Sequence, residues 1–214
     1  MIDFRLYMIT DRKRSAPRSL QSIVRSACEA GVRVIQLREK DLSIEELEEH
    51  TARLLEITAE HDTLLIVNRG APITATEDVF LAASTGAQGF HFPDDAPHPS
   101  ELRKRFPDLV IGVSTHNAER AVTAASDGAD FVTFGPVFHT SSRTGSAAPR
   151  GLDALREVCT ITSIPVYAVG GVTPGNAAAC RAAGAHGVAV VGAIMEARDV
   201  PAVVGDFERA LGSL

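Results

Sequence analysis

The sequence predicts a (β/α)8 barrel, an α/β fold in which eight parallel strands alternate with helices, as a single domain over residues 1–214. Short apolar and β-branched runs alternate with longer helical patterns from end to end, which is typical of parallel strands joined by crossover helices. Eight such units in 214 residues leave about 27 residues each, enough for a strand, a helix and two short loops. The alternative is an open doubly wound sheet, but no GxGxxG motif follows the first strand to support its dinucleotide-binding form.

The eight expected strands are mostly continuous apolar runs, because helices cover one face of a parallel barrel and the packed interior covers the other. In chain order they are Arg5–Thr10, Arg33–Arg38, Thr63–Asn68, Gly89–Phe92, Val110–Ser114, Phe131–Phe134, Val166–Val169 and Gly187–Val191.

The intervening helices carry their own start and stop signals. Ser43 and Glu46 form a capping box ahead of a helix that runs toward His61, and Asn117 is an N-cap before Glu119. Four helix ends share one pattern, in which small residues precede a glycine and a strand begins two residues later. These glycines are suited to the left-handed conformation that ends a helix, and they are Gly31, Gly86, Gly128 and Gly184.

Composition narrows the function classes. Apolar residues make up 45% and charged residues 22%, which indicates a folded globular protein. The net charge of −6 disfavours nucleic acid as a partner, and no apolar stretch approaches the roughly 20 residues of a membrane span. The N-terminus lacks the pattern of an export signal, and the three cysteines lack metal-site spacing and suit buried, reduced thiols. We expect a cytoplasmic protein, and a homodimer is compatible with the sequence.

Polar residues follow the second expected strand, at the barrel end where function resides. Gln36, Arg38 and Lys40 alternate with Leu37 and Glu39, so they share one side of an extended segment. Two cations and an amide at a barrel mouth suit a phosphate or diphosphate, whereas the alternative is a solvated cluster of charges.

Glycines follow the seventh and eighth strands, where barrels usually bind phosphate. Gly170 and Gly171 follow one strand, and Val191 and Gly192 follow the other. Backbone N–H groups can approach an anion there because no side chain intervenes. The sequence therefore predicts a phosphate subsite at these two loops.

Other candidates lie after the middle strands. The long irregular stretch 135–146 suits a mobile lid over an anionic ligand. His91 precedes Asp94 and Asp95, two carboxylates that either bind Mg²⁺ or form a charge pair at a helix entry.

Six ordered motifs along the chain resemble the thiamine phosphate synthase/TenI family. They are YMITD at Tyr7–Asp11, VIQLREK at Val34–Lys40, IVN at Ile66–Asn68, IGVSTH at Ile111–His116, GPVFHTSSR at Gly135–Arg143 and IPVYAVGGVTP at Ile164–Pro174. The resemblance implies a barrel of thiamine biosynthesis. In the synthase branch a hydroxymethylpyrimidine diphosphate loses diphosphate, and the nitrogen of a thiazole phosphate captures the carbocation-like species.

The resemblance also implies roles for particular residues. Those implied to face the pyrimidine and its diphosphate are Gln36, Arg38, Lys40 and Asn68, with Ser114 nearby. Those implied to lie over the diphosphate and the thiazole phosphate are Thr140, Ser142 and Arg143, the last in place of the family's lysine. Those implied to hold the thiazole phosphate are Gly171, Val191 and Gly192.

Two departures from the synthase pattern concern its metal ligands. Asn68 is followed by Arg69 where the synthase has an Mg²⁺-binding Asp, and Ala96 stands at the second such position, with Asp94 and Asp95 near but out of register. TenI-like proteins lack this metal pair, and the characterised activity among them is thiazole tautomerisation. The tautomerase histidine corresponds to Pro136 here, so His139 or His116 would have to carry the proton.

We therefore predict an enzyme that binds thiazole phosphate, a small-molecule phosphate, and we favour TenI-type proton transfer with His139 or His116 as the catalytic residue. This prediction includes no metal and no other cofactor. Two alternatives remain. One is a thiamine phosphate synthase that uses Mg²⁺ through Asp94 or Asp95, and the other is a non-catalytic regulator that binds the same ligand.

Overall fold

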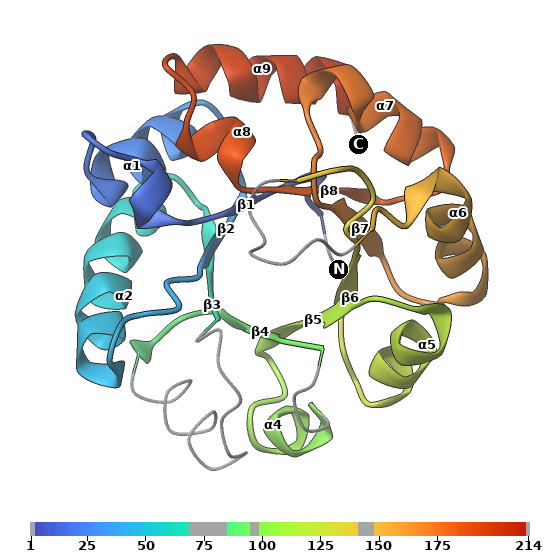
Figure 1. Cartoon of the computed structure of the whole chain (residues 1–214). Coiled ribbons are helices and arrows are strands. Elements are labelled where there is room, and N and C mark those ends of the chain that lie inside the picture. The colour runs from blue at the N-terminus through green and yellow to red at the C-terminus, as the bar shows by residue number, and fades with distance from the viewer. Residues whose placement is uncertain (1–2, 69–84, 95–98, 141–147, 213–214) are drawn as a thin grey trace.

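The computed structural model describes residues 3–68, 85–94, 99–140 and 148–212. Its eight strands pair in parallel and in chain order, and β1 pairs with β8 to close the barrel (Figure 1). The strands are β1 (Leu6–Ile9), β2 (Val34–Leu37), β3 (Leu64–Val67), β4 (Gly89–Phe92), β5 (Val110–Thr115), β6 (Phe131–Phe134), β7 (Val166–Val169) and β8 (Gly187–Val190). Each predicted boundary agrees to within one residue, so the barrel prediction is confirmed and the open sheet is wrong.

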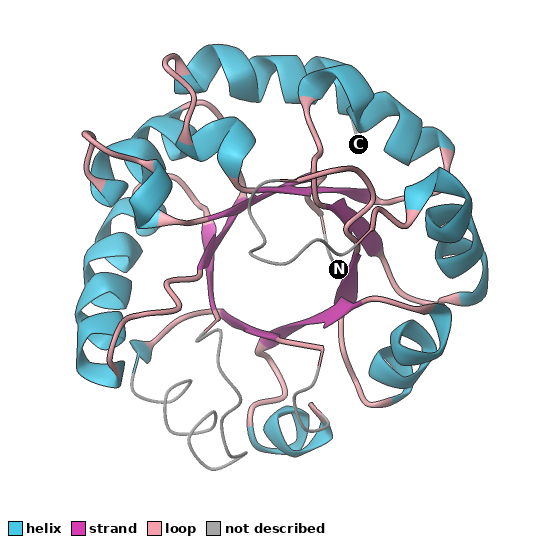
Figure 2. Ribbon diagram, in the orientation of Figure 1, coloured by secondary structure: helices cyan, strands magenta, loops and turns pink. Residues whose placement is uncertain are grey.

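Helices surround the strands on the outside of the barrel (Figure 2). They are α1 (Leu20–Glu29), α2 (Ile44–Ala59), α4 (Ser100–Arg105), α5 (Ala118–Ser126), α6 (Gly151–Ile161), α7 (Pro174–Ala182), α8 (Gly192–Met195) and α9 (Val200–Leu211), with the 3₁₀ helix η1 (Arg12–Arg14) after β1. The short helices η1 and α8 were not predicted from the sequence, because a single turn has no hydrophobic periodicity to detect.

The predicted helix boundaries have the expected chemistry. Ser43 Oγ accepts from the Glu46 backbone N–H at 3.2 Å, and the Glu46 carboxylate accepts from the Ser43 N–H at 2.8 Å. Asn117 Oδ1 accepts from the Arg120 N–H at 2.8 Å. The four helix-terminating glycines have positive φ, from 69° at Gly86 to 103° at Gly31.

The core has two layers because side chains alternate along each strand. Most of the buried apolar side chains, mainly aliphatic, pack between the strands and the helices. Inside the barrel an aromatic plug formed by Phe4, Tyr7, Phe131 and Tyr167 fills the interior, and the Tyr167 hydroxyl donates to the Phe4 carbonyl at 2.6 Å. The three cysteines form no disulfide, and Cys28 and Cys180 are buried as expected, whereas Cys159 is half-buried. Among the described residues no helix is both long and apolar enough to cross a bilayer.

Candidate functional site

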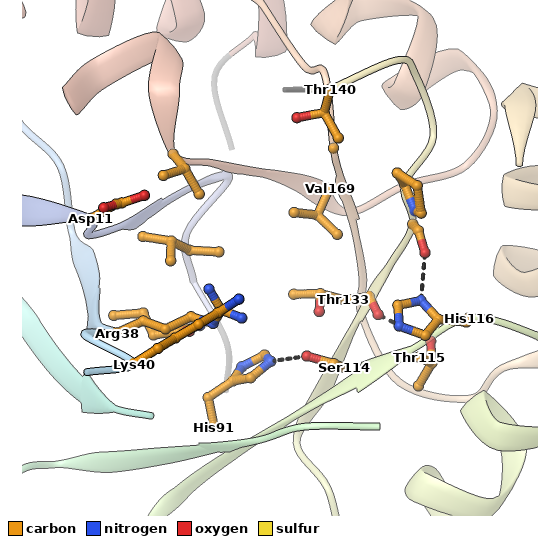
Figure 3. Close-up of a pocket in the computed structure, with 16 residues that line it drawn as sticks. Asp11, Arg38, Lys40, His91, Ser114, Thr115, His116, Thr133, Thr140 and Val169 are labelled. Carbon is orange, nitrogen blue, oxygen red and sulfur yellow. Dashed lines mark hydrogen bonds between the residues drawn. The ribbon is translucent and has the colours of Figure 1, made fainter. Parts of the chain in front are cut away.

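A pocket of about 110 Å³, open on one side, lies at the carboxyl ends of the strands, where the barrel rule places function (Figure 3). We call it the central pocket. Its described lining residues come from the ends of seven strands, β1, β2 and β4 to β8, and are Ile9, Asp11, Gln36, Arg38, Lys40, His91, Ser114, Thr115, His116, Thr133, Gly135, Pro136, Thr140, Val169, Gly170 and Val191.

The segment after β2 carries the cations as the alternation predicted. Figure 3 shows Arg38 and Lys40 pointing into the central pocket. Glu39, between them in the chain, is buried and does not line this pocket. Glu39 accepts hydrogen bonds from the Thr10 hydroxyl at 2.7 Å and from the Arg12 backbone N–H at 3.1 Å. The Thr10 hydroxyl in turn accepts from the Arg38 N–H at 3.0 Å. These bonds fix the turn that presents Arg38 and Lys40.

Five polar side chains form a continuous hydrogen-bonded row beneath the central pocket, and three of them, Gln36, His91 and Ser114, line it. The Asn68 amide donates to Gln36 Oε1 at 2.9 Å, and the Gln36 amide donates to the Tyr7 hydroxyl at 2.7 Å. The Tyr7 oxygen lies 3.3 Å from His91 Nδ1, and His91 Nε2 lies 3.0 Å from Ser114 Oγ. Four of these side chains are buried, and Ser114 carries the row to the pocket surface.

The row carries no charge near neutral pH. Burial, together with the positive charge of Arg38, lowers the pKa of His91 to about 3. Burial also raises the pKa of the Tyr7 phenol far above its usual value, against an opposing hydrogen bond from Gln36. The side chains beneath the pocket are therefore polar but uncharged, whereas Arg38 and Lys40 bring positive charge to it.

A second pocket adjoins the first and is built on the predicted glycines. It shares Thr140, Val169, Gly170 and Val191 with the central pocket and adds Gly171 and Gly192. A Cβ on Gly171, at φ 66°, would lie 2.2 Å from the His139 carbonyl oxygen, so the loops after β6 and β7 pack at a distance only glycine allows. We call this the glycine pocket.

The sequence analysis did not predict two charged residues that line the glycine pocket, Arg14 and Glu196. Arg14, on η1, lies over Gly192, where a Cβ would be 3.3 Å from its Nη1. Its guanidinium pairs with Glu196 and with Asp11, the latter at 3.2 Å from Nε. The position of η1 directly after β1, at the functional end of the barrel, was the signal that could have identified Arg14.

The structure separates the two candidate histidines. His116, at the end of β5, is half-buried and lines the central pocket, whereas His139 is exposed and lines the glycine pocket. His116 Nδ1 donates to the Gly135 carbonyl at 2.5 Å, which fixes the orientation of the ring at the pocket.

Other predicted residues fall into three groups. Thr140 and Val191 lie where the two pockets meet. Asn68 lies behind Gln36, and is not among the described residues that line either pocket. Ser142 and Arg143, like Arg69, Asp95 and Ala96 of the metal argument, lie outside the described residues.

The described residues do not fit a Mg²⁺ ion. In the described part of the chain no three His, Cys, Asp or Glu side chains come together in a group that could hold a metal. The groups that line the pocket from β2, β4 and β5 are an amide, a guanidinium, an ammonium, two imidazoles and two hydroxyls, whereas Mg²⁺ prefers carboxylate and phosphate oxygens. Asp11, the carboxylate among the described lining residues, is paired with Arg14.

Comparison with known proteins identifies the family. A family profile described as thiamine monophosphate synthase matches residues 6–194. The chain belongs to this family. A thiamine-phosphate synthase of Chloroflexus aurantiacus is 36% identical over 214 residues, covering all of this chain and 95% of the relative. A putative thiamine-phosphate synthase 2 of Aquifex aeolicus is 37% identical over 192 residues, covering 90% of this chain and 98% of the relative.

A solved structure of the thiamine monophosphate synthase family has the same fold. The thiamine phosphate pyrophosphorylase from Pyrococcus furiosus superimposes with a TM-score of 0.82 at 31% identity, covering 97% of this chain and 95% of that one. The recognised resemblance is thereby confirmed. The preference for TenI-type tautomerisation is not confirmed, because these relatives carry the name of the synthase or pyrophosphorylase.

Proposed function

We propose that the protein is a thiamine phosphate synthase, which joins a hydroxymethylpyrimidine diphosphate to a thiazole phosphate and releases diphosphate. The observation that carries the proposal is the adjacency of a pocket lined by cations and a pocket lined by glycines. Arg38 and Lys40 present cations to the central pocket, and Gly170, Gly171 and Gly192 present backbone to the glycine pocket that adjoins it. A reaction between a diphosphate and a phosphate ester needs two such regions side by side. The names of the relatives support the same reaction.

The chemistry follows from the charges on the described residues. The bond between the pyrimidine's exocyclic methylene carbon and the diphosphate oxygen breaks, and its electron pair leaves with the diphosphate. Arg38 and Lys40 stabilise the negative charge that develops there. The thiazole nitrogen then gives its lone pair to the methylene carbon, and the positive charge ends on the thiazolium ring. The uncharged row at Tyr7 and His91 does not oppose a positively charged carbon above it.

A second candidate, the thiazole tautomerase, is favoured by a different observation. His116 places an imidazole on the central pocket, with Nδ1 held by the Gly135 carbonyl. An imidazole in a fixed tautomer can take a proton from one ring position and return it to another. This chemistry needs no metal, in keeping with the cationic character of the described donor set.

One experiment separates the candidates. The pure protein is incubated with thiazole carboxylate phosphate alone, and separately with thiazole phosphate plus the pyrimidine diphosphate, and products are followed by chromatography. Both incubations are run with added Mg²⁺ and with EDTA. Thiamine phosphate and diphosphate in equal amounts would support the synthase. Conversion of the carboxylate phosphate alone would support the tautomerase, and ligand binding without either product would support the regulator.

The role of the cations has a matched control. Lys40→Gln removes a cation from the central pocket, whereas Lys104→Gln removes one from exposed α4, where it pairs with Glu101. Loss of a charge-assisted contact to diphosphate predicts a fall in kcat/KM of about 10-fold or more for the first variant. The second variant should match the wild type, and equal rates for all three proteins would contradict the assignment of Lys40.

A further inference from the structure

The row of hydrogen bonds under the central pocket has a direction. The Asn68 amide nitrogen faces Gln36 Oε1, so Gln36 turns its own amide nitrogen toward the Tyr7 oxygen at 2.7 Å. An amide N–H can only donate, so the Tyr7 oxygen accepts this bond and has one hydrogen left to give. The neighbour at 3.3 Å on its other side is His91 Nδ1, which therefore accepts.

The direction continues through the imidazole. His91 is neutral near pH 7, and a neutral imidazole whose Nδ1 accepts carries its hydrogen on Nε2. Nε2 lies 3.0 Å from Ser114 Oγ, so the ring donates to the serine oxygen. The Ser114 hydroxyl hydrogen is thus not used within the row, and Ser114 lines the central pocket.

The imidazole is also held in place sterically. A Cβ on Gly112 of β5 would lie 2.5 Å from His91 Nδ1 and 2.4 Å from Phe131 Cζ. The imidazole of His91 therefore fits only because position 112 is a glycine. The ring centroids of His91 and Phe131 are 5.7 Å apart, and those of His91 and Tyr7 are 5.9 Å apart. The packing keeps Nδ1 toward Tyr7 and Nε2 toward Ser114.

We propose that Tyr7 and His91 are positioning residues that make the Ser114 hydroxyl an obligate hydrogen-bond donor to the ligand ring in the central pocket. This inference rests on the proposed function only in taking that ligand to be the pyrimidine. A heteroaromatic ring nitrogen with a free lone pair can accept the hydrogen bond from the Ser114 hydroxyl. A ring with a C–H or N–H at the same position cannot accept it, and its hydrogen would lie against the hydroxyl hydrogen of Ser114. The row therefore selects for the substrate ring before any bond breaks.

The direction of the hydrogen bonds in the row can be measured on the wild-type protein without a ligand. Labelling histidine with ¹⁵N and recording ring nitrogen shifts at pH 7 distinguishes the two neutral tautomers. We expect His91, assigned by its loss in His91→Gln, to carry its hydrogen on Nε2. A hydrogen on Nδ1 would reverse the whole row, turn the Ser114 lone pairs toward the pocket and overturn the proposal.

The effect of the Tyr7 hydroxyl on the His91 tautomer and on pyrimidine binding is measured with a pair of tyrosine variants. Tyr7→Phe removes a hydroxyl that belongs to the row. Tyr167→Phe removes a hydroxyl of the same aromatic plug that lies outside the row and donates to the Phe4 carbonyl. We expect Tyr7→Phe to mix the His91 tautomers and to weaken binding of hydroxymethylpyrimidine by about 3- to 10-fold, the value of one hydrogen bond. Tyr167→Phe should leave both readouts unchanged.

A double-mutant cycle distinguishes positioning from general damage to the barrel. In a Ser114→Ala background, Tyr7→Phe should cause no further loss of pyrimidine affinity, because the group that it positions is gone. Additive losses would show that Tyr7 acts through stability alone and would overturn the proposal.

Substrate analogues provide a test that requires no variant. Replacing each pyrimidine ring nitrogen in turn by C–H should weaken wild-type binding at one position by about 10-fold, and Ser114→Ala should remove that discrimination. Equal affinities for all analogues would contradict the inference. If no pyrimidine binds at all, the proposed function fails, while the tautomer measurement still decides the direction of the row.

Discussion

Glu39 offers the sharpest test of how the barrel presents its cations. This residue is buried, yet it belongs to neither pocket and no ligand is expected to touch it. Its Oε1 accepts from the Thr10 hydroxyl and the Arg12 backbone N–H, and its Oε2 accepts from the same N–H at 3.1 Å and from Arg12 Nη1 at 3.3 Å. The perturbation is Glu39→Gln, which keeps the size of the side chain and replaces one oxygen by an amide.

The magnitude follows from these contacts. Glutamine keeps one oxygen for Thr10 and the Arg12 N–H, but its amide nitrogen then faces the guanidinium, donor against donor. One charge-assisted hydrogen bond in a buried site is lost, and the loss of such a bond costs about 1.5–3 kcal/mol. We expect the free energy of unfolding to fall by about 2–3 kcal/mol. Because glutamine keeps the bond to the Thr10 hydroxyl, which accepts from the Arg38 N–H, the turn that presents Arg38 should persist, and pyrimidine diphosphate affinity should change less than stability.

The assay is urea unfolding followed by far-ultraviolet circular dichroism, since the chain has no tryptophan. Asp41→Asn is the control, because Asp41 pairs with the same Arg12 at 41% side-chain exposure, where solvent screens the interaction. The control should lose less than half of the stability that Glu39→Gln loses. Equal losses in the two variants, or wild-type stability in Glu39→Gln, would refute the argument that burial gives Glu39 its importance.

Three other predictions concern single residues. Because the pKa of His91 is lowered to about 3, this residue stays neutral in the folded protein while the unfolded chain binds a proton below about pH 6.5, so stability falls as pH drops. His91→Gln should therefore remove about 1.4 kcal/mol per pH unit from the slope of unfolding free energy between pH 6 and 4, and parallel curves would contradict this. Gly192→Asp should weaken thiazole phosphate binding in calorimetry by roughly 2 kcal/mol or more, whereas Gly205→Asp on α9 should not, and equal affinities would exclude an anion from the glycine pocket. If the protein tautomerises thiazole carboxylate phosphate, His116→Gln should slow it by about 100-fold or more and exposed His139→Gln by only a few-fold, and the reverse order would restore His139 as the proton carrier.

The barrel could be predicted from the sequence because its signals are local. A run such as Leu64–Val67 is apolar because both of its faces are covered, and a helix end such as Gly31 needs a positive φ wherever the chain turns into a strand. The side shared by Arg38 and Lys40 was also predictable, since the alternation of an extended segment depends only on neighbouring residues.

What only the tertiary structure decided is which residues from distant strands meet. Tyr7 and His91 are 84 positions apart, and nothing in their local sequence shows that they share one row beneath the central pocket. Arg14 and Glu196 are 182 positions apart and meet only because β1 pairs with β8. The choice between His116 and His139 likewise needed the path of two loops. Secondary structure follows from short-range sterics and hydrophobic periodicity, whereas a site at a barrel mouth is defined by closure, which brings the ends of eight separated segments to one place.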